Sequence, residues 1–211
     1  MKKTKVLILG AGGAIAQHAI DFLNDEKALE LTLFLRNTKQ VKQFKNMIVT
    51  EGDVLNEKQL NNAMKGQDIV YANLSGNMEK MAELIVNSMK ANNVRRLIFI
   101  ASLGIYDEIP GKFGEWNRKM IGAELVTYRK AADVIEASGL EYTIVRPAWL
   151  TDADVVDYEL TQKNEPFKGT EVSRKSVGAF VADLILHPQK EVKSSVGVDQ
   201  PGTEGDKPSF Y

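Results

Sequence analysis

The sequence predicts an α/β fold: a doubly wound parallel sheet covered by helices, with a small cap formed by the C-terminal part of the chain. Short apolar runs alternate with longer segments of helical period, which is typical of stacked strand-helix units. The apolar cores VLIL, LIFIA and YTIV are unbroken, as in strands buried on both faces. Because crossovers between parallel strands are right-handed, this order of elements predicts a doubly wound sheet.

Each strand is predicted from a short apolar run, and each helix from apolar residues that recur with a helical period. The predicted strands are Lys5–Leu9, Leu31–Leu35, Asn46–Thr50, Ile69–Ala72, Arg96–Ala101 and Tyr142–Arg146, with a short last strand, Ser195–Val198, at the sheet edge. The predicted helices are Ala14–Asn24, Lys58–Met64, Glu79–Asn92, Arg118–Ser138 and Ser173–Leu186. The last helix stops before Pro188, which cannot continue it, and the segment Pro166–Arg174 is expected to hold the loop and strand that lead into it.

Length and composition favour one globular domain over residues 1–211, with a binding core over roughly 1–150 and a small cap with the edge strand over 151–211. A net charge of −1 with mixed signs gives no electrostatic reason to expect nucleic acid or a membrane as a partner. The absence of cysteine excludes disulfides and thiolate metal sites and fits a cytoplasmic location. The apolar run Val6–Leu9 is too short for a signal peptide or a membrane span.

A glycine-rich turn, GAGGAIA, joins the first strand to the first helix. Glycines here let backbone N–H groups and the helix dipole approach a pyrophosphate, as in Rossmann-type dinucleotide sites. We expect Gly10, Gly12, Gly13, Ala14 and Ile15 to hold the pyrophosphate; the alternative is a plain glycine turn. The spacing of Gly10, Gly13 and Ala16 resembles the extended and atypical short-chain dehydrogenases/reductases.

The second strand ends in Arg36 and Asn37, with no carboxylate to accept from a ribose 2′-hydroxyl. An arginine at this position accommodates the 2′-phosphate of NADP, so Arg36 favours NADPH over NADH. The alternative is a solvated arginine at a strand end.

The third and fourth strands end in small or turn-forming residues. Resemblance to the superfamily implies that Asp53 and Val54 hold the adenine, although a Gly-Asp pair is also common in turns. After the fourth strand, Leu74, Ser75 and Gly76 are expected to let the backbone pass the cofactor ribose, or simply to form the turn.

The fifth strand leads into Ser102-Leu103-Gly104-Ile105-Tyr106, which looks like the Ser-x-x-x-Tyr pattern of extended short-chain reductases. The string SGLEYTIVRPAWL at 138–150 resembles the NmrA-like, NAD(P)-binding group of atypical members. The resemblance implies that Ser102 hydrogen-bonds the reacting carbonyl and that Pro147 and Ala148 contact the nicotinamide. A serine that only satisfies backbone groups is the alternative for Ser102.

The usual proton-transfer pair of the superfamily, Tyr-x-x-x-Lys, is absent because no tyrosine has a lysine four residues later. Tyr128 and Lys130 lie about 200° apart on a helix, so they cannot share a face. Tyr128 falls on an apolar stripe and is expected to be a core residue. The missing pair argues against ordinary carbonyl reduction, but it does not argue against cofactor binding, because the hydride comes from the cofactor.

The substrate pocket is expected to involve Tyr106, Trp116, Asn117 and Trp149, with the segment Gly111–Asn117 as a loop at its mouth. Its aromatic side chains are expected to stack on a planar substrate or, alternatively, to anchor the loop by packing. The isolated His18 and His187 indicate no metal site. Helix faces offer a surface for a homodimer, but none is singled out.

Together these features predict an NADPH-dependent oxidoreductase of the atypical short-chain type that reduces a small or planar acceptor such as a quinone, flavin or enone. Two alternatives stay open. One is a non-catalytic NADP(H)-binding redox sensor, and the other is a sugar-nucleotide epimerase or dehydratase, which the short C-terminal part and the missing tyrosine disfavour.

Overall fold

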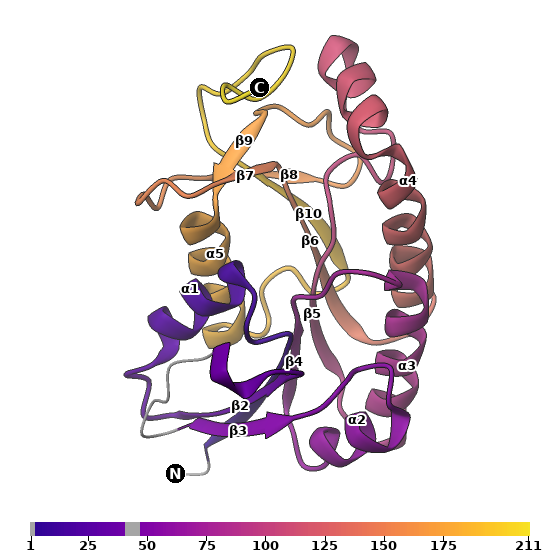
Figure 1. The fold of residues 1–211 in the computed structure, drawn as a ribbon, viewed down its shortest axis with the longest axis vertical. Helices are drawn as coiled ribbons and strands as arrows, with labels where there is room; N and C mark the ends of the chain where they lie inside the picture. Colours follow the sequence, from indigo (N-terminus) through magenta and orange to yellow (C-terminus); the bar gives the residue numbers. More distant parts are fainter. Residues whose placement is uncertain (1–2, 41–46) are drawn as a thin grey trace.

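A computed structural model of the chain describes residues 3–40 and 47–211. One large sheet forms the middle layer of the molecule, and helices cover both of its faces (Figure 1). The strands are β1 (Thr4–Leu9), β2 (Leu29–Leu35), β3 (Met47–Glu51), β4 (Ile69–Ala72), β5 (Arg96–Ile100), β6 (Glu141–Pro147), β7 (Trp149–Thr151), β8 (Glu159–Gln162), β9 (Glu171–Ser173) and β10 (Ser194–Asp199). The helices are α1 (Ala14–Leu23), α2 (Glu57–Met64), α3 (Met78–Ala91), α4 (Gly111–Glu136) and α5 (Arg174–Leu186), with a 3-10 turn at Thr38–Gln40.

The main sheet has the order β3-β2-β1-β4-β5-β6-β10-β8, and every strand pair except β10–β8 is parallel. From β1 the chain adds β2 and β3 toward one edge of the sheet, and it then returns to the other side of β1, where β4 and the later strands extend toward the opposite edge. The strand order therefore reverses between β1 and β4. The predicted α/β doubly wound sheet is confirmed, and the predicted strand start at Asn46 lies outside the described residues.

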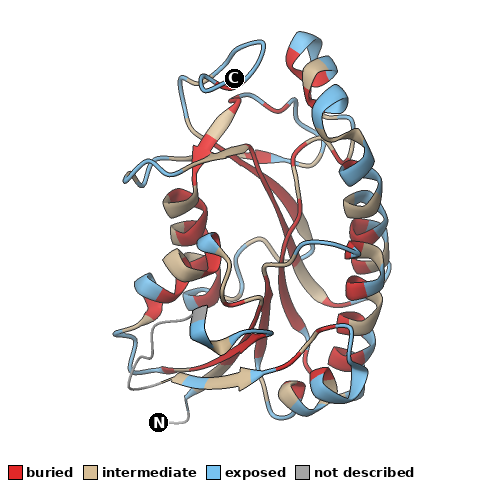
Figure 2. Ribbon diagram, viewed as in Figure 1, coloured by how far each residue is buried: buried red, intermediate tan, exposed pale blue. Residues whose placement is uncertain are grey.

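Alternating side chains of the strands enter separate cores on the two faces of the sheet. In β1, Val6 and Ile8 pack with α1 and α5, whereas Leu7 and Leu9 pack with the helices on the opposite face. Figure 2 shows the buried residues concentrated in the central strands and on the inward sides of the helices. This two-sided burial explains why the central strands are apolar without interruption.

The predicted edge position of the last strand is wrong. β10 lies between β6 and β8, and the antiparallel β8 forms the edge beside it. Because β8 is short and only partly apolar, its sequence ELTQ gave no strand signal, and the brief β7 was missed in the same way. The strand expected within Pro166–Arg174 is present as β9, which pairs with β7 in a separate small sheet.

The predicted loop Gly111–Asn117 is also wrong, because α4 already begins at Gly111 and is interrupted at Ile121, with φ −131° and ψ 22°. The helix start was not predicted because the segment contains two glycines, which have a low helix propensity. One of them is required by packing, since a Cβ on Gly114 would lie 2.1 Å from the carbonyl oxygen of Ile109.

Candidate cofactor and substrate site

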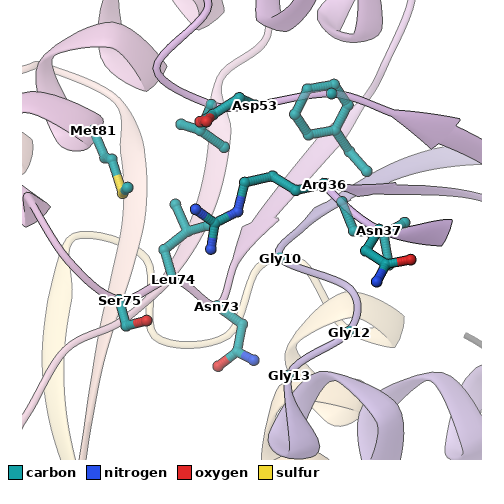
Figure 3. A pocket seen from close by; sticks show the side chains of 14 residues that line it. Gly10, Gly12, Gly13, Arg36, Asn37, Asp53, Asn73, Leu74, Ser75 and Met81 are labelled. Atoms are coloured by element: carbon teal, nitrogen blue, oxygen red, sulfur yellow. The ribbon is translucent and has the colours of Figure 1, made fainter. Parts of the chain in front are cut away.

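A cavity of about 360 Å³ opens at the carboxyl ends of β1 and β4, where the strand order reverses. Ligands of open parallel sheets bind at this topological position. Its walls are formed by Gly10, Gly12, Gly13, Phe34, Leu35, Arg36, Asn37, Gly52, Asp53, Val54, Asn73, Leu74, Ser75 and Met81 (Figure 3).

The glycine turn packs closely against Asn73, the residue that follows β4. A Cβ on Gly10, whose φ is +77°, would lie 2.1 Å from the carbonyl oxygen of Asn73. A Cβ on Gly13 would lie 2.2 Å from Nδ2 of the same asparagine. Gly13 is the N-cap of α1 and provides no side-chain cap, so the first amides of the helix are available to an anion.

Arg36 and Asp53 lie on the far side of this cavity from the glycine turn. Backbone bonds hold the strand ends in line: Gly10 N–H donates to Phe34 O at 2.9 Å and Gly52 N–H to Leu35 O at 3.0 Å. Arg36 is exposed, and Figure 3 shows its side chain extending into the pocket between Asp53 and the glycine turn. The Asp53 carboxylate accepts the N–H of Leu55 at 2.9 Å, which fixes its orientation.

A second cavity, of about 520 Å³, shares Asn73 and Leu74 with the first. It is lined in addition by Ile15, Ile100, Ala101, Ser102, Leu103, Ile121, Tyr128, Pro147, Ala148, Trp149, Leu150, Arg174, Phe210 and Tyr211. Ser102 is half-buried here, and its hydroxyl donates to the carbonyl oxygen of Leu103 at 3.2 Å. The two cavities thus adjoin at Asn73 and Leu74, and together they extend from Arg36 to Trp149 and Tyr211.

The structure gathers most of the predicted site residues on the walls of these two adjoining cavities. Gly10, Gly12, Gly13, Arg36, Asn37, Asp53, Val54, Leu74 and Ser75 line the first cavity, and Ile15, Leu74, Ser102, Pro147, Ala148 and Trp149 line the second. Ala14 and Gly76 are exposed beside the first cavity without lining either.

Trp116 and Asn117 stand behind the wall of the second cavity. Asn117 is fully buried, and its Oδ1 accepts a hydrogen bond from Nε1 of Trp149 at 2.9 Å. The ring of Trp116 lies 4.8 Å from that of Trp149 and 5.0 Å from that of Tyr211. The aromatic wall therefore consists of Trp149 and Tyr211, held in place by residues that the sequence had assigned to the pocket itself.

Tyr106 lies in a different place from the one that the sequence predicted, because the loop after β5 turns its side chain away from the second cavity. Its hydroxyl donates to Glu136 at 2.8 Å, and it lines a separate surface cavity with Arg129 and Lys163. Glu108 causes this turn by accepting the N–H groups of Gly104 and Tyr106, both at 2.9 Å. Burial, as the largest effect, raises the pKa of Tyr106.

A buried ion pair holds that loop in place. The side chain of Arg146 is fully buried and pairs with Glu108, which is almost fully buried. Arg146 also donates to Oγ of Ser195 at 3.1 Å, which joins the loop to β10. The loop that carries Ser102 is thereby fixed to the sheet through side chains of three separate segments.

Sequence reasoning missed two kinds of residue on the second cavity. Tyr128 was expected in the core, and together with Ile121 it does pack against the core on that face of the sheet, but both side chains are only partly buried and also line the cavity, whereas Ala132 and Ile135 are fully buried. Burial, followed by the charge of Glu124, raises the pKa of Tyr128. The second kind is the pair Phe210–Tyr211. The segment after β10 brings this pair onto the wall of the second cavity, and no local sequence pattern predicts that position.

The fold and this site together define a Rossmann-type protein that binds a dinucleotide. A family model described as NAD(P)H-binding matches residues 10–188, so the chain belongs to this family. It is 51% identical to a Rossmann-fold NAD(P)-binding family protein from Shigella flexneri, with 99% of both chains covered and a TM-score of 0.86.

Two further relatives extend this comparison. A short-chain dehydrogenase/reductase from Veillonella parvula, solved in complex with NADP, is 30% identical over 98% of this chain and 99% of its own, with a TM-score of 0.89. Oxidoreductase aprR from Aspergillus flavus is 24% identical, with 92% of this chain and 68% of the relative covered. The resemblance to NAD(P)-binding short-chain dehydrogenases/reductases is therefore confirmed, and the family includes oxidoreductases.

Two further findings concern membrane spans and metal sites. None of the helices in the described part of the chain is both long and apolar enough to span a membrane. Among residues 3–40 and 47–211, no three side chains of His, Asp or Glu gather closely enough to hold a metal ion.

Proposed function

We propose that the protein is an NADPH-dependent oxidoreductase that reduces a planar acceptor such as a quinone, flavin or enone. The observation that carries the proposal is that the two cavities adjoin at Asn73 and Leu74. A dinucleotide stretched from Arg36 to Ser102 would place its reactive ring in the second cavity, which is lined by both apolar and polar groups. Hydride transfer needs such a cavity because the acceptor must be held against the ring.

The residues present fit a dinucleotide. The uncapped start of α1 and the glycine turn offer backbone amides to the diphosphate, while Asp53 and Val54 lie where an adenine would sit. Pro147 and Ala148 form the wall beside Ser102. When bound, NADPH supplies the hydride.

The preference for NADPH over NADH rests on Arg36. Its guanidinium reaches into the first cavity, and a phosphate on the ribose gives it a doubly charged partner. Arg36→Asp should weaken NADPH binding at least tenfold and leave NADH binding within about threefold, as measured by fluorescence titration. Equal losses for both nucleotides would show that Arg36 does not select the phosphate.

The proton for the reduced acceptor requires a donor in the second cavity. Ser102 can hydrogen-bond the reacting oxygen, since its hydroxyl makes only a long bond to Leu103 O. Tyr128 lines the same wall and can donate a hydrogen bond to the reacting oxygen, although its raised pKa makes it a weaker acid than an exposed tyrosine. Lys130 does not assist it, because it lies about 200° away on the helix, where its ammonium forms an exposed ion pair with Glu79 at 3.0 Å.

NADPH oxidation with 1,4-naphthoquinone, FMN and an enone as acceptors tests this function. Ser102→Ala should abolish most of the turnover with NADPH affinity unchanged, and Tyr128→Phe should lower kcat more than KM. Tyr106→Phe is the matched control, because Tyr106 lies outside the site and its loss should leave kcat unchanged. Turnover that survives both Ser102→Ala and Tyr128→Phe contradicts these roles.

A second candidate function is a non-catalytic NADP(H) sensor, favoured by the missing Tyr-x-x-x-Lys pair and by the engagement of Lys130 with Glu79. Tight NADPH binding without oxidation by any acceptor would establish it. Cytoplasmic location, homodimer formation and a small-molecule rather than nucleic-acid partner stay predictions of the sequence.

A further inference from the structure

Arg174 is the only charged side chain among the described residues that line the second cavity. It occupies the first position of α5, directly after the N-cap Ser173, whose hydroxyl accepts the N–H of Ser176 at 2.9 Å. This cap fixes the start of the helix and hence the point from which Arg174 extends.

The guanidinium of Arg174 is only partly engaged. Its Nη1 donates to Oδ1 of Asp152 at 2.7 Å and to the carbonyl oxygen of Leu150 at 3.4 Å. Within the described chain, its Nε and Nη2 make no hydrogen bond with another side chain or with the backbone, and the side chain is 28% exposed. Donors of a guanidinium are therefore free at the wall of the cavity.

The competing carboxylate is a weak partner. The side chain of Asp152 is 87% exposed, and ion pairs at such exposed positions contribute little because water and salt screen them. No Asp or Glu side chain lies among the described residues on the cavity wall. A ligand carboxylate or sulfonate held inside the cavity would form a better-shielded, bidentate pair with Arg174.

The rest of this wall fits a flat ring. The rings of Trp149 and Tyr211 lie 5.2 Å apart at an angle of 80°, and Leu150 continues the surface toward Arg174. A conjugated ring system packed on these side chains gains the energy of aromatic contacts. An anionic substituent on its edge would then lie within reach of the arginine.

From this arrangement we propose that the acceptor is a planar conjugated molecule with an anionic substituent, which Arg174 binds while Trp149 and Tyr211 contact the ring. The inference rests on the proposed oxidoreductase function, because it names the chemical class of the acceptor for the same site.

Two probes that share one ring system and differ by one anionic substituent test the proposal: 1,4-naphthoquinone-2-sulfonate and 1,4-naphthoquinone. Binding to the protein saturated with NADP+ is measured by quenching of tryptophan fluorescence, so that differences in reactivity between the quinones do not enter. The sulfonate should bind about tenfold more tightly to the wild type, as expected for a charge-assisted pair.

Arg174→Met should remove this preference without changing the affinity for the neutral quinone, and Arg174→Lys should restore part of it. Lys175→Met is the matched control, since Lys175 forms a similar exposed pair with Asp154, at 2.6 Å, but does not line the cavity. This control should keep the full preference.

Equal affinity for both probes in the wild type, no binding of either, or a preference that survives Arg174→Met would overturn the proposal. Failure of the oxidoreductase function looks different: the sulfonate would then bind in an Arg174-dependent manner, yet neither quinone would be reduced by NADPH. Reduction of both quinones with equal KM would support the function and reject the anion site.

Discussion

Replacing Asp199 with asparagine should stabilise the protein at neutral and alkaline pH. Asp199 is fully buried at the end of β10, where Oδ2 accepts the N–H of Gly169 at 2.8 Å. Its other oxygen, Oδ1, has no hydrogen-bond partner among the described residues. Burial, against the smaller effect of the Gly169 bond, raises the pKa of Asp199 to about 6.

The size of the effect follows from this pKa. An ordinary aspartate has a pKa of 3.8, so the native state holds its proton up to about pH 6, about two units beyond the unfolded chain. Each unit corresponds to about 1.4 kcal/mol, and stability is therefore lost as pH rises from about 4 to about 6, by at most about 3 kcal/mol. Above that window the loss is constant. Asparagine keeps an oxygen for Gly169 and carries no charge, so most of this loss should disappear.

Urea unfolding of the wild type and of Asp199→Asn between pH 4 and pH 8 measures the difference. The variant should be more stable by about 2–3 kcal/mol at pH 8 and by close to nothing at pH 4. Asp183→Asn is the control with the opposite sign. There, hydrogen bonds from Lys190 and His187 outweigh the effect of burial and lower the pKa of Asp183, so its removal should destabilise the protein at pH 8. An Asp199→Asn variant no more stable than the wild type at pH 8 refutes the reasoning.

Three other substitutions test the supports of the site. Glu108→Ala should destabilise the protein by about 3–5 kcal/mol in urea unfolding, because it leaves the buried Arg146 without its counter-charge; a loss below 1 kcal/mol would contradict this. Tyr211→Ala should raise KM for quinones severalfold with NADPH affinity unchanged, since it removes one side of the aromatic wall; an unchanged KM would show that the wall does not contact the acceptor. Asn117→Leu should shift the tryptophan emission of the folded protein, because Nε1 of Trp149 loses its acceptor, and unaltered emission would argue against that bond.

The cofactor half of the site was predictable because it is built from local backbone features. Gly10, Gly13 and the start of α1 lie within a few residues of one another, and each strand end in a parallel sheet faces the same edge. Arg36 and Asp53 could therefore be placed from their positions after β2 and β3. No side-chain packing had to be known.

The substrate half could not be predicted in this way, because distant side chains decide it. Trp149 is oriented by Asn117 in α4 and contacted by Tyr211, while the loop of Ser102 is held by Glu108 and Arg146. The continuous helical stripe that predicted a core position for Tyr128 was correct in phase. It could not reveal that this partly buried side chain also lines the cavity.

The glycine turn shows why the choice of variant matters for testing cofactor binding. Gly10 has no room for a Cβ beside the backbone of Asn73, so a side chain there would disturb β1 and β4 whether or not a diphosphate binds. Loss of NADPH affinity in such a variant would report on folding as much as on the ligand. Arg36 is exposed and carries no such packing constraint, so a change in nucleotide preference on its substitution can be assigned to the cofactor. The feature that best identifies the fold is thus the weaker test of function, and the solvent-exposed arginine is the stronger one.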